Sequence, residues 1–376
     1  MWLARKEIAR AKGRFVLLSA AVGLLIFLIL FQQALLNGLI TDFVGAVKNQ
    51  NAEVLVFNEQ ARKNVEGSFL TPDQTAAIAT VDGVADTGLI GESTFTAIAG
   101  GTDTDAVLFG YELDGLGEPT TLTEGRLPLG PNEAVASAAD ADDGFDIGDQ
   151  IEIVGTDGPV ITVVGLGREL RWSVSATLFV SYDTFEAAQR AVNPDASVVL
   201  PSLVGVEPEA GVDAATVTER INASVVGTEA LTRQQAIDEN PGVTGTRQSF
   251  QIILALGFIV VLIVVGFFFL ILTVQKARPL TLLRAIGSPQ SFLVKNTLAQ
   301  IALVWGLGVL IGLGLTFFAL AVIPSGGLSV SVEPTAAAGS IAALFVLSMI
   351  AGLASVRRVL RIDPIDATVD ASRSLQ

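Results

Sequence analysis

The stretch RPLTLLRAIGSPQSF, residues 278–292, separates two of the most apolar segments of the chain. Before it stands ILALGFIVVLIVVGFFFLILTV, residues 253–274, and after it stands LAQIALVWGLGVLIGLGLTFFALAV, residues 298–322. A helix rises about 1.5 Å per residue, so each apolar segment is long enough to cross a hydrocarbon core of about 30 Å. The stretch between them is basic, with no acidic residue from Lys276 to Lys295. The pattern predicts two membrane helices joined by a short cationic connection.

Two further apolar segments meet the same length criterion, so four transmembrane helices are expected. The predicted boundaries are 1–14 for a cytoplasmic N-terminal helix, 15–40 for the first span, 41–247 for an extracytoplasmic domain, 248–275 for the second span, 276–296 for a cytoplasmic loop, 297–323 for the third span, 324–335 for a short outer loop, 336–356 for the fourth span and 357–376 for a cytoplasmic tail. A signal peptide is the alternative for the first segment. Its apolar run is longer than the usual core of about 7–15 residues, and no A-x-A cleavage site follows it.

Charge is divided unevenly along the chain, which carries a net −15 in total. Residues 41–247 hold 33 acidic and 10 basic side chains, a net of −23, and all other residues together have a net of +8. Lys and Arg accumulate in cytoplasmic loops of membrane proteins. The chain is therefore expected in the plasma membrane with both termini in the cytoplasm and 41–247 outside. The acidic domain also argues against binding of nucleic acid.

The N-terminal tail, WLARKEIARAKGR, has helical spacing of its apolar residues. Trp2, Leu3, Ile8 and Ala9 can share one side of a helix while five basic residues occupy the rest. Such a helix lies in the membrane interface, with Trp2 at the level of the headgroups. The alternative is a basic flank that only orients the first span.

Composition excludes several kinds of catalytic and metal site. The chain has no Cys and no His, so it lacks disulfides, thiolate ligands and the usual neutral-pH base. No GxxxxGK[ST] motif occurs, so the chain is not itself an ATP hydrolase. The acidic run DADDGFDIGD, residues 140–149, lacks the glutamate that closes a calcium loop, and a solvated acidic turn is expected there. We predict no catalytic residue and no metal site.

The domain at 41–247 mixes strand and helix patterns, which predicts an α+β fold. The expected strands are 52–58, 161–167, 177–182 and 196–207, and the expected helices are 71–81, 182–192 and 213–225. Thr71 is the expected N-cap of the first helix, with Pro72 in its first turn. A hairpin is expected over 146–167, turning at Asp157 and Gly158.

Several of these stretches resemble the FtsX/MacB-type permeases of ABC transporters, the type VII or mechanotransmission systems. The resemblance rests on LARKEIARAKGRFVLLSAAVGLLIFL, FDIGDQIEIVG, PLTLLRAIGSPQSFLVKNTLAQ and the terminal VRRVLRIDPIDATV, with its motif at Asp363, Pro364 and Ala367. It implies four membrane helices in a 1+3 arrangement with the α+β domain between helices 1 and 2. It also implies a homodimer in membrane lipid, served by a separate cytoplasmic ATPase dimer that binds ATP and Mg²⁺.

The resemblance implies that residues 278–292 form a coupling helix that docks on this ATPase. The residues expected to make the contact are Arg278, Leu280, Leu282, Leu283, Arg284, Ile286 and Gly287. Pro279 suits the first turn of a helix, and Gly287 suits its end. Members of that family usually carry an acidic residue near the position of Thr281, and this chain departs from their pattern there. A basic loop retained inside by charge alone is the alternative, but it does not explain the Leu/Ile set.

The substrate is the least specified part of the prediction. The size of the outer domain resembles that of hemin-export permeases, so hemin or another amphipathic compound is expected as substrate, and no cofactor bound by this chain. Only Met349, Tyr111, Tyr182 or a carboxylate remain as ligands for iron. Gln32, Gln33 and Asn37 either bind substrate or form hydrogen bonds between helices. Gly306, Gly308, Gly312 and Gly314 suit close helix packing.

Two functions from other classes remain open alongside transport. An FtsX-like regulator would signal to a cell-envelope partner and move no substrate. A membrane-anchored extracellular enzyme is disfavoured, because the outer domain lacks His, Cys and a recognisable group of catalytic residues.

Overall fold

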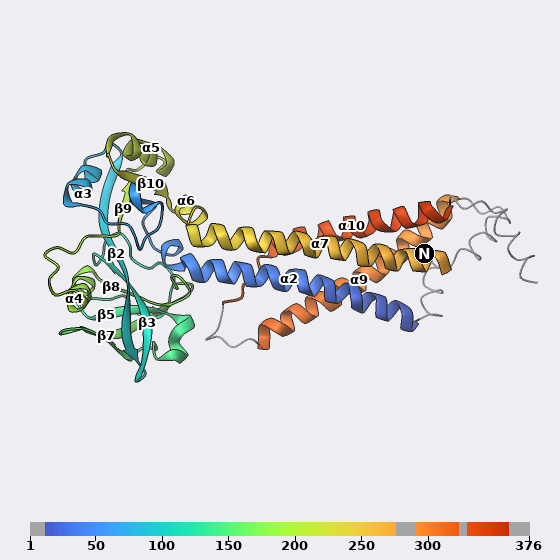
Figure 1. The fold of residues 1–376 in the computed structure, drawn as a ribbon, viewed down its shortest axis with the longest axis horizontal. Helices are drawn as coiled ribbons and strands as arrows, with labels where there is room; N and C mark the ends of the chain where they lie inside the picture. The colour runs from blue at the N-terminus through green and yellow to red at the C-terminus, as the bar shows by residue number, and fades with distance from the viewer. Residues whose placement is uncertain (1–11, 276–289, 323–328, 361–376) are drawn as a thin grey trace, which may run out of the picture. The chain divides into compact units, whose positions relative to one another are not determined.

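The computed structural model describes residues 12–275, 290–322 and 329–360 (Figure 1). These residues form two compact units. The helical unit contains 12–37, 249–322 and 331–360, and the sheet unit contains 38–248 with 329–330.

Four helices have the length and composition of membrane spans: α2 (Lys12–Lys48), α7 (Pro241–Gln275), α9 (Gln290–Val322) and α10 (Pro334–Leu360). The prediction of four such helices is confirmed, whereas their 1+3 arrangement across a membrane stays a prediction. Helix α2 continues past residue 40, the predicted end of the first span, to Lys48, and the span boundaries themselves stay predictions. Helix α9 likewise begins at Gln290, before the expected start at 297. The helical ends extend past the apolar runs because polar residues such as Asp42 do not by themselves stop a helix.

The core of the helical unit lies between α2 and the other three helices. Ile26 and Ile29 of α2 are fully buried, together with Val261 and Val265 of α7. The exposed side chains of these helices are also large and apolar, including Ile263 and Phe267 of α7. Helices that are apolar on all sides are typical of a membrane environment.

Helices α2 and α9 cross closely at three glycines. A Cβ atom on Gly308 would lie 2.7 Å from Cγ1 of Val22, and one on Gly312 would lie 2.9 Å from the carbonyl oxygen of Gly23. Gly308 and Gly312 are four residues apart and share one helix face, a spacing that lets two backbones approach. The prediction of close packing is wrong for the other two glycines, Gly306 and Gly314. Gly306 and Gly314 have no atom within 4 Å of a built Cβ, because they point away from that face.

The sheet unit begins as a ferredoxin-like fold. Strands β1 (Val54–Asn58), β2 (Val84–Ala99), β9 (Leu203–Pro208) and β10 (Thr228–Thr232) lie antiparallel in the order β10-β1-β9-β2. Helix α3 (Pro72–Ala79) connects β1 to β2, and α5 (Ala214–Ser224) connects β9 to β10. Both helices pack on one face, with Ile78, Val217 and Ile221 against buried valines of the strands. This β-α-β-β-α-β connectivity defines the split βαβ motif.

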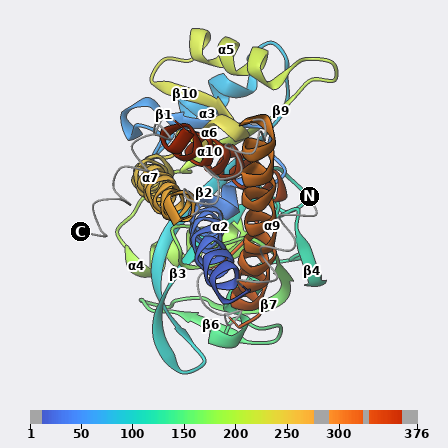
Figure 2. The same ribbon diagram turned by 90° about the vertical axis from the view of Figure 1, so that its right-hand side faces the viewer.

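The remaining strands form a small closed barrel inserted between β2 and β9. From the second half of β2 the order runs through β3 (Thr102–Tyr111), β8 (Ala176–Ser181), β5 (Glu133–Ser137), β7 (Val160–Gly167) and β6 (Gln150–Ile153). Strand β6 then pairs with β2 again, which closes the ring. Short strand β4 (Leu122–Gly125) pairs with the end of β7. In Figure 2, the α3 and α5 end and the barrel strands β3, β6 and β7 lie at opposite ends of the sheet unit.

Four shorter helices complete the sheet unit: α4 (Tyr182–Val192), α6 (Arg233–Asp238), and the 3-10 turns η1 (Glu59–Ala61) and η2 (Ala138–Asp143). Helix α4 seals the barrel with Phe185. A Cβ on Gly91 or Gly110 would stand 2.2 or 2.4 Å from this side chain, so both strands require glycine at these points.

Most of the predicted domain elements are confirmed, with one strand shortened. The N-cap at Thr71 forms a complete capping box with Gln74, and the hairpin of β6 and β7 turns with Asp157 at φ 54°. The predicted start of the strand over 196–207 is wrong, because β9 begins only at Leu203. Pro201 lacks an N–H for a strand ladder, and its carbonyl instead accepts from the N–H of Leu70.

Candidate functional site

All seven residues predicted to contact an ATPase lie outside the described part of the chain. They are Arg278, Leu280, Leu282, Leu283, Arg284, Ile286 and Gly287, and the same holds for Asp363, Pro364 and Ala367 of the tail and residues 1–11 of the N-terminal helix. Their roles stay predictions.

The predicted polar residues of the first span lie within the helical unit and contact other helices. Nε2 of Gln33 donates to Oγ of Ser340 in α10 at 2.6 Å, and Nε2 of Gln32 donates to the carbonyl oxygen of Phe250 in α7 at 3.3 Å. Asn37 lies one turn later and is half-buried. These hydrogen bonds favour the helix-packing interpretation of Gln32 and Gln33 over substrate binding.

Replacing Gln33 by Leu is expected to lower the stability of the helical unit by about 1 kcal/mol, as for other hydrogen bonds between membrane helices. Thermal unfolding of the full chain in detergent would measure this loss for Gln33→Leu, Ser340→Ala and the double variant. If the hydrogen bond carries the effect, the double variant loses less than the sum of the two single losses. Strictly additive losses would contradict the proposed pairing.

The last turns of α2 lie in the sheet unit and are bound by the β7–β8 loop, residues 168–175. The N–H groups of Ser173 and Val174 donate to the carbonyl oxygens of Phe43 and Asp42, at 3.1 and 2.9 Å. The N–H of Ala46 donates back to the carbonyl oxygen of Arg171 at 3.1 Å. Backbone bonds that run in both directions fix the register of neighbouring strands in a sheet, and here three such bonds fix a helix end to a loop.

The approach of the loop to α2 imposes constraints on both segments. A Cβ on Gly45 would lie 2.4 Å from the carbonyl oxygen of Glu169, so α2 needs glycine at this position. In the loop, Glu169, Ser173 and Val174 have φ of 56°, 48° and 62°. The left-handed region is strained for a β-branched residue such as Val174, and such strain persists only where surrounding contacts fix the backbone.

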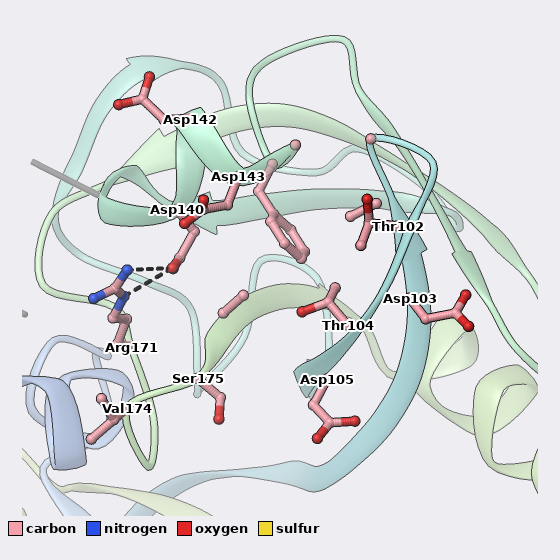
Figure 3. Close-up of a pocket in the computed structure, with 15 residues that line it drawn as sticks. Thr102, Asp103, Thr104, Asp105, Asp140, Asp142, Asp143, Arg171, Val174 and Ser175 are labelled. Carbon is pink, nitrogen blue, oxygen red and sulfur yellow. Dashed lines mark hydrogen bonds and ion pairs between the residues drawn. The ribbon is translucent and has the colours of Figure 1, made fainter. Parts of the chain in front are cut away.

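A buried ionic network joins this loop to α2. Nε and Nη2 of Arg171 donate to Oδ1 of Asp140 at 2.9 and 2.5 Å, as Figure 3 shows, and Nη1 stands 3.8 Å from Oδ2 of Asp42. Ser329 completes the network, since its Oγ and N–H donate to the two carboxylate oxygens of Asp42 at 2.6 and 2.9 Å. Arg171, Asp140 and Asp42 are all buried.

Burial and pairing have opposing effects on these charges. Burial raises the pKa of Asp140, and the hydrogen bonds from Arg171 offset only part of this rise. Burial also disfavours the charged guanidinium, but the hydrogen bonds to Asp140 together with the negative charges of Asp140, Asp42 and Asp143 outweigh this and raise the pKa of Arg171. The expectation of a wholly solvated acidic turn at 140–149 is therefore wrong for Asp140, because Arg171 compensates its charge inside the fold. Asp142 and Asp143 are exposed.

The end of α2 and the start of α7 share one hydrophobic core beneath the ferredoxin-like sheet. Val44 and Val47 of α2 and Val243 of α7 are buried in the same cluster as Trp172 of the β7–β8 loop and Phe57 of β1. On β1, Val54 and Val56 face α3 and α5, so Leu55 and Phe57 face the opposite way. The two helix ends thus support the face of the sheet that α3 and α5 leave uncovered.

The hollow in Figure 3 lies beside this network and has a volume of about 900 Å³. Acidic side chains line it: Asp103, Asp105, Asp140, Asp142 and Asp143. They do not converge, since Asp142 and Asp103 stand on opposite sides of the view and Asp140 turns to Arg171. Among the described residues, no group of three or more Asp or Glu side chains is arranged to hold a metal ion.

Sequence reasoning did not find the Arg171 network. Its one local signal is a basic residue between two large apolar residues, Leu170 and Trp172, in a strongly acidic domain. An arginine flanked by buried apolar residues is itself buried only when an acidic side chain pairs with it.

Comparisons with known proteins agree with the sequence motifs. The family model described as FtsX-like permease C-terminal matches residues 251–364. A "putative hemin transport system permease protein HrtB" of Staphylococcus haemolyticus is 23% identical, covering 98% of this chain and 99% of that protein. An uncharacterized ABC transporter permease of Mycobacterium tuberculosis is 25% identical over 98% of this chain and 99% of its own length.

Among solved structures, the periplasmic region of MacB from Actinobacillus actinomycetemcomitans is 13% identical, with a TM-score of 0.37, covering 50% of this chain and 92% of that one. The extracellular domain of the noncanonic ABC-type transporter YknZ from Gram-positive bacteria is 14% identical, with a TM-score of 0.33, covering 48% of this chain and all of that one.

Proposed function

We propose that this chain, which matches the FtsX-like permease model over residues 251–364, is an ABC transporter permease that converts ATP hydrolysis on a separate cytoplasmic ATPase into movement of its extracytoplasmic sheet unit. Two copies of the permease and an ATPase dimer would form the working assembly, with both termini of each permease in the cytoplasm. One observation carries the proposal. The last turns of α2 and the first turns of α7 are buried in the sheet unit's own core.

A helix that is itself part of a core transmits displacement more directly than a flexible linker would. Helix α2 is continuous from Lys12 to Lys48, and α7 from Pro241 to Gln275. A packed core is close to incompressible, so its residues follow a moving helix end together. Relative motion of the two helices would therefore change the packing of Val44, Val47 and Val243 beneath the sheet. This transmission needs no aqueous pore through the membrane.

The ATPase contact is proposed at the connection between α7 and α9. The double variant Leu283→Asp, Arg284→Glu is expected to reduce co-purification of the ATPase at least about tenfold, because it removes an apolar contact and a charge-assisted one, worth roughly 1.5–3 kcal/mol for the latter alone. The double variant Lys276→Glu, Lys295→Glu makes a comparable change in charge without touching the Leu/Ile set. If both variants lose the ATPase equally, charge alone retains the loop and the docking helix is wrong.

Hemin, or another amphipathic compound, is the proposed substrate, on the strength of the distant relative named as a hemin transport permease. The tyrosines and the methionine named as ligands for iron are poorly placed in this chain. Tyr111 is buried in the core, and burial raises the pKa of both Tyr111 and Tyr182, which disfavours the phenolate that binds iron. Met349 packs against the core of the helical unit. We therefore propose that apolar contacts, rather than axial ligation, hold the porphyrin.

Metal-free protoporphyrin IX separates these two modes of binding. In nanodiscs containing the permease and its ATPase, hemin and protoporphyrin IX are expected to change the ATPase rate to a similar extent, since the iron makes no bond to the protein. An effect of hemin alone, with a shift of its Soret band, would show that a side chain ligates iron. No effect of either compound would remove the porphyrin from consideration and favour a signalling role.

A further inference from the structure

Three segments far apart in the sequence meet at Arg171, and we propose that this residue positions the end of the first membrane helix on the barrel. Asp42 belongs to α2, Asp140 to η2 between β5 and β6, and Arg171 to the β7–β8 loop. Ser329, which precedes α10, is bound to the same Asp42. The inference rests on the proposed function and names the residues through which displacement of α2 reaches the barrel.

The charges of the network make Arg171 its central member. One guanidinium serves two buried carboxylates, and it also donates to the carbonyl oxygen of Ala139 at 3.1 Å. Oδ2 of Asp140 is buried and makes no hydrogen bond within the described residues, so Asp140 depends on Arg171 for its compensation. The planar fork of arginine donates in fixed directions, so its hydrogen bonds to Asp140 and Ala139 fix η2 against the loop, and the same guanidinium presents Nη1 to Asp42 of α2 at 3.8 Å.

The surrounding contacts show why placement, rather than adhesion, is the role of the network. A buried ion pair is weak evidence for stability, because desolvation of the charges consumes most of their attraction. The apolar contacts of Val44, Val47 and Trp172 already hold the parts together, but they do not specify position. Strain in the backbone of Ser173 and Val174 indicates a loop held in place by its contacts with α2.

The connection before α10 is pressed against the same part of α2. A Cβ on Gly38 would lie 1.6 Å from the carbonyl oxygen of Ser329, so no other residue fits there without displacing this connection. Asp42, one helical turn later, binds the side chain and N–H of Ser329. A shift of α2 along its axis would therefore break the hydrogen bonds of Asp42 to Ser329 and its ion pair with Arg171 together, unless the barrel and the connection move with the helix.

The first part of the test needs no ATPase. The chain has no Cys, so introduced cysteines are the only sites for spin labels. One labelled pair, Lys48→Cys with Glu152→Cys, joins the end of α2 to barrel strand β6. A second pair, Asp103→Cys with Glu152→Cys, lies within the barrel. In the full chain in nanodiscs, Arg171→Met is expected to broaden the distance distribution of the first pair at least about twofold and to leave the second unchanged.

Matched variants decide between positioning and general damage. Arg190→Met removes an exposed arginine of α4 and should leave both pairs unchanged. If Arg171→Met also broadens the pair within the barrel, the fold is damaged, and Asp42→Asn then replaces it, since this variant keeps the side-chain shape and removes the charge. An unchanged first pair in the folded variant overturns the inference.

The second part adds the ATPase and ATP. In the unmodified network, the distance between the first pair of labels should stay fixed during turnover while each label moves relative to a third, membrane-bound label. In Arg171→Met the ATPase rate should be retained, whereas movement of the barrel label falls at least about threefold. Full movement of the barrel label in that variant overturns the inference. If the distance between the first pair of labels stays fixed in the unmodified chain but neither label moves relative to the membrane when ATP is added, that result contradicts the proposed function instead.

Discussion

Replacing Glu92 by Gln is expected to prevent most of the loss of stability that this chain undergoes as the pH rises from about 5 to about 8. Glu92 is 3% exposed in β2, opposite Phe109 of β3. Neither of its carboxyl oxygens makes a hydrogen bond within the described residues. Burial, with a smaller contribution from the charge of Glu66, raises its pKa from 4.5 to about 8. The side chain is thus a neutral acid at physiological pH.

The sign of the effect follows from proton binding in the two states. The unfolded chain releases the Glu92 proton near pH 4.5, whereas the folded chain holds it up to about pH 8. Between these values the folded state binds one more proton, so stability falls as the pH rises, by about 1.4 kcal/mol per unit. The stabilisation contributed by protonated Glu92 is fully present below pH 4.5, and about 4 kcal/mol of it is lost by pH 8. Gln cannot ionise, so the variant keeps its stability over this range.

Thermal unfolding of the full chain in detergent at pH 5, 6.5 and 8 measures the difference. The midpoint of the unmodified chain should fall with pH, and that of Glu92→Gln should fall much less, although the buried amide costs about 1–3 kcal/mol at pH 5. Glu133→Gln is the matched control. The hydrogen bonds from Arg126 and the N–H of Leu129 lower the pKa of Glu133 to about 2, so it does not titrate between pH 5 and 8. Equal slopes for all three chains would show that Glu92 is ionised in the fold.

Elements specified by local residues could be predicted from the sequence. The four long helices are visible as apolar runs, and the capping box at Thr71 and the turn at Asp157 depend on residues within a few positions. The long hairpin of β2 and β3 was harder to predict, because its residues are small where Phe185 packs against Gly91 and Gly110. Glycine at these positions weakens the strand pattern while being required by a side chain distant in the sequence.

The candidate site divides in the same way. Gln32 and Gln33 stand out as polar residues in an apolar run, although their hydrogen bonds favour helix packing. Asp42 and Asp140 look like ordinary acidic residues of a domain with many of them. Their burial depends on Arg171, which only the folding of the barrel against the end of α2 brings to both. A local sequence pattern cannot reveal ion pairs between residues that are distant in the sequence.

Replacing Gly312 by Leu is expected to destabilise the helical unit by about 3 kcal/mol, the upper part of the range for overpacking a core. A Cβ at this position would stand 2.8 Å from Cγ2 of Ile26 and 2.9 Å from the carbonyl oxygen of Gly23. Ile26 can change rotamer, but the backbone of Gly23 cannot withdraw unless α2 and α9 separate. Separation would also strip apolar contacts from the buried face of α2 along its length.

Gly314→Leu separates this steric effect from the general effect of adding leucine to α9. It makes the same chemical change two residues away, at an exposed position with no atom within 4 Å of the new Cβ. Leu is a better helix former than Gly by somewhat under 1 kcal/mol, so the control should be neutral or slightly more stable. Thermal unfolding in detergent should therefore separate the two variants by several degrees. Equal midpoints would mean that α2 and α9 do not cross at Gly312.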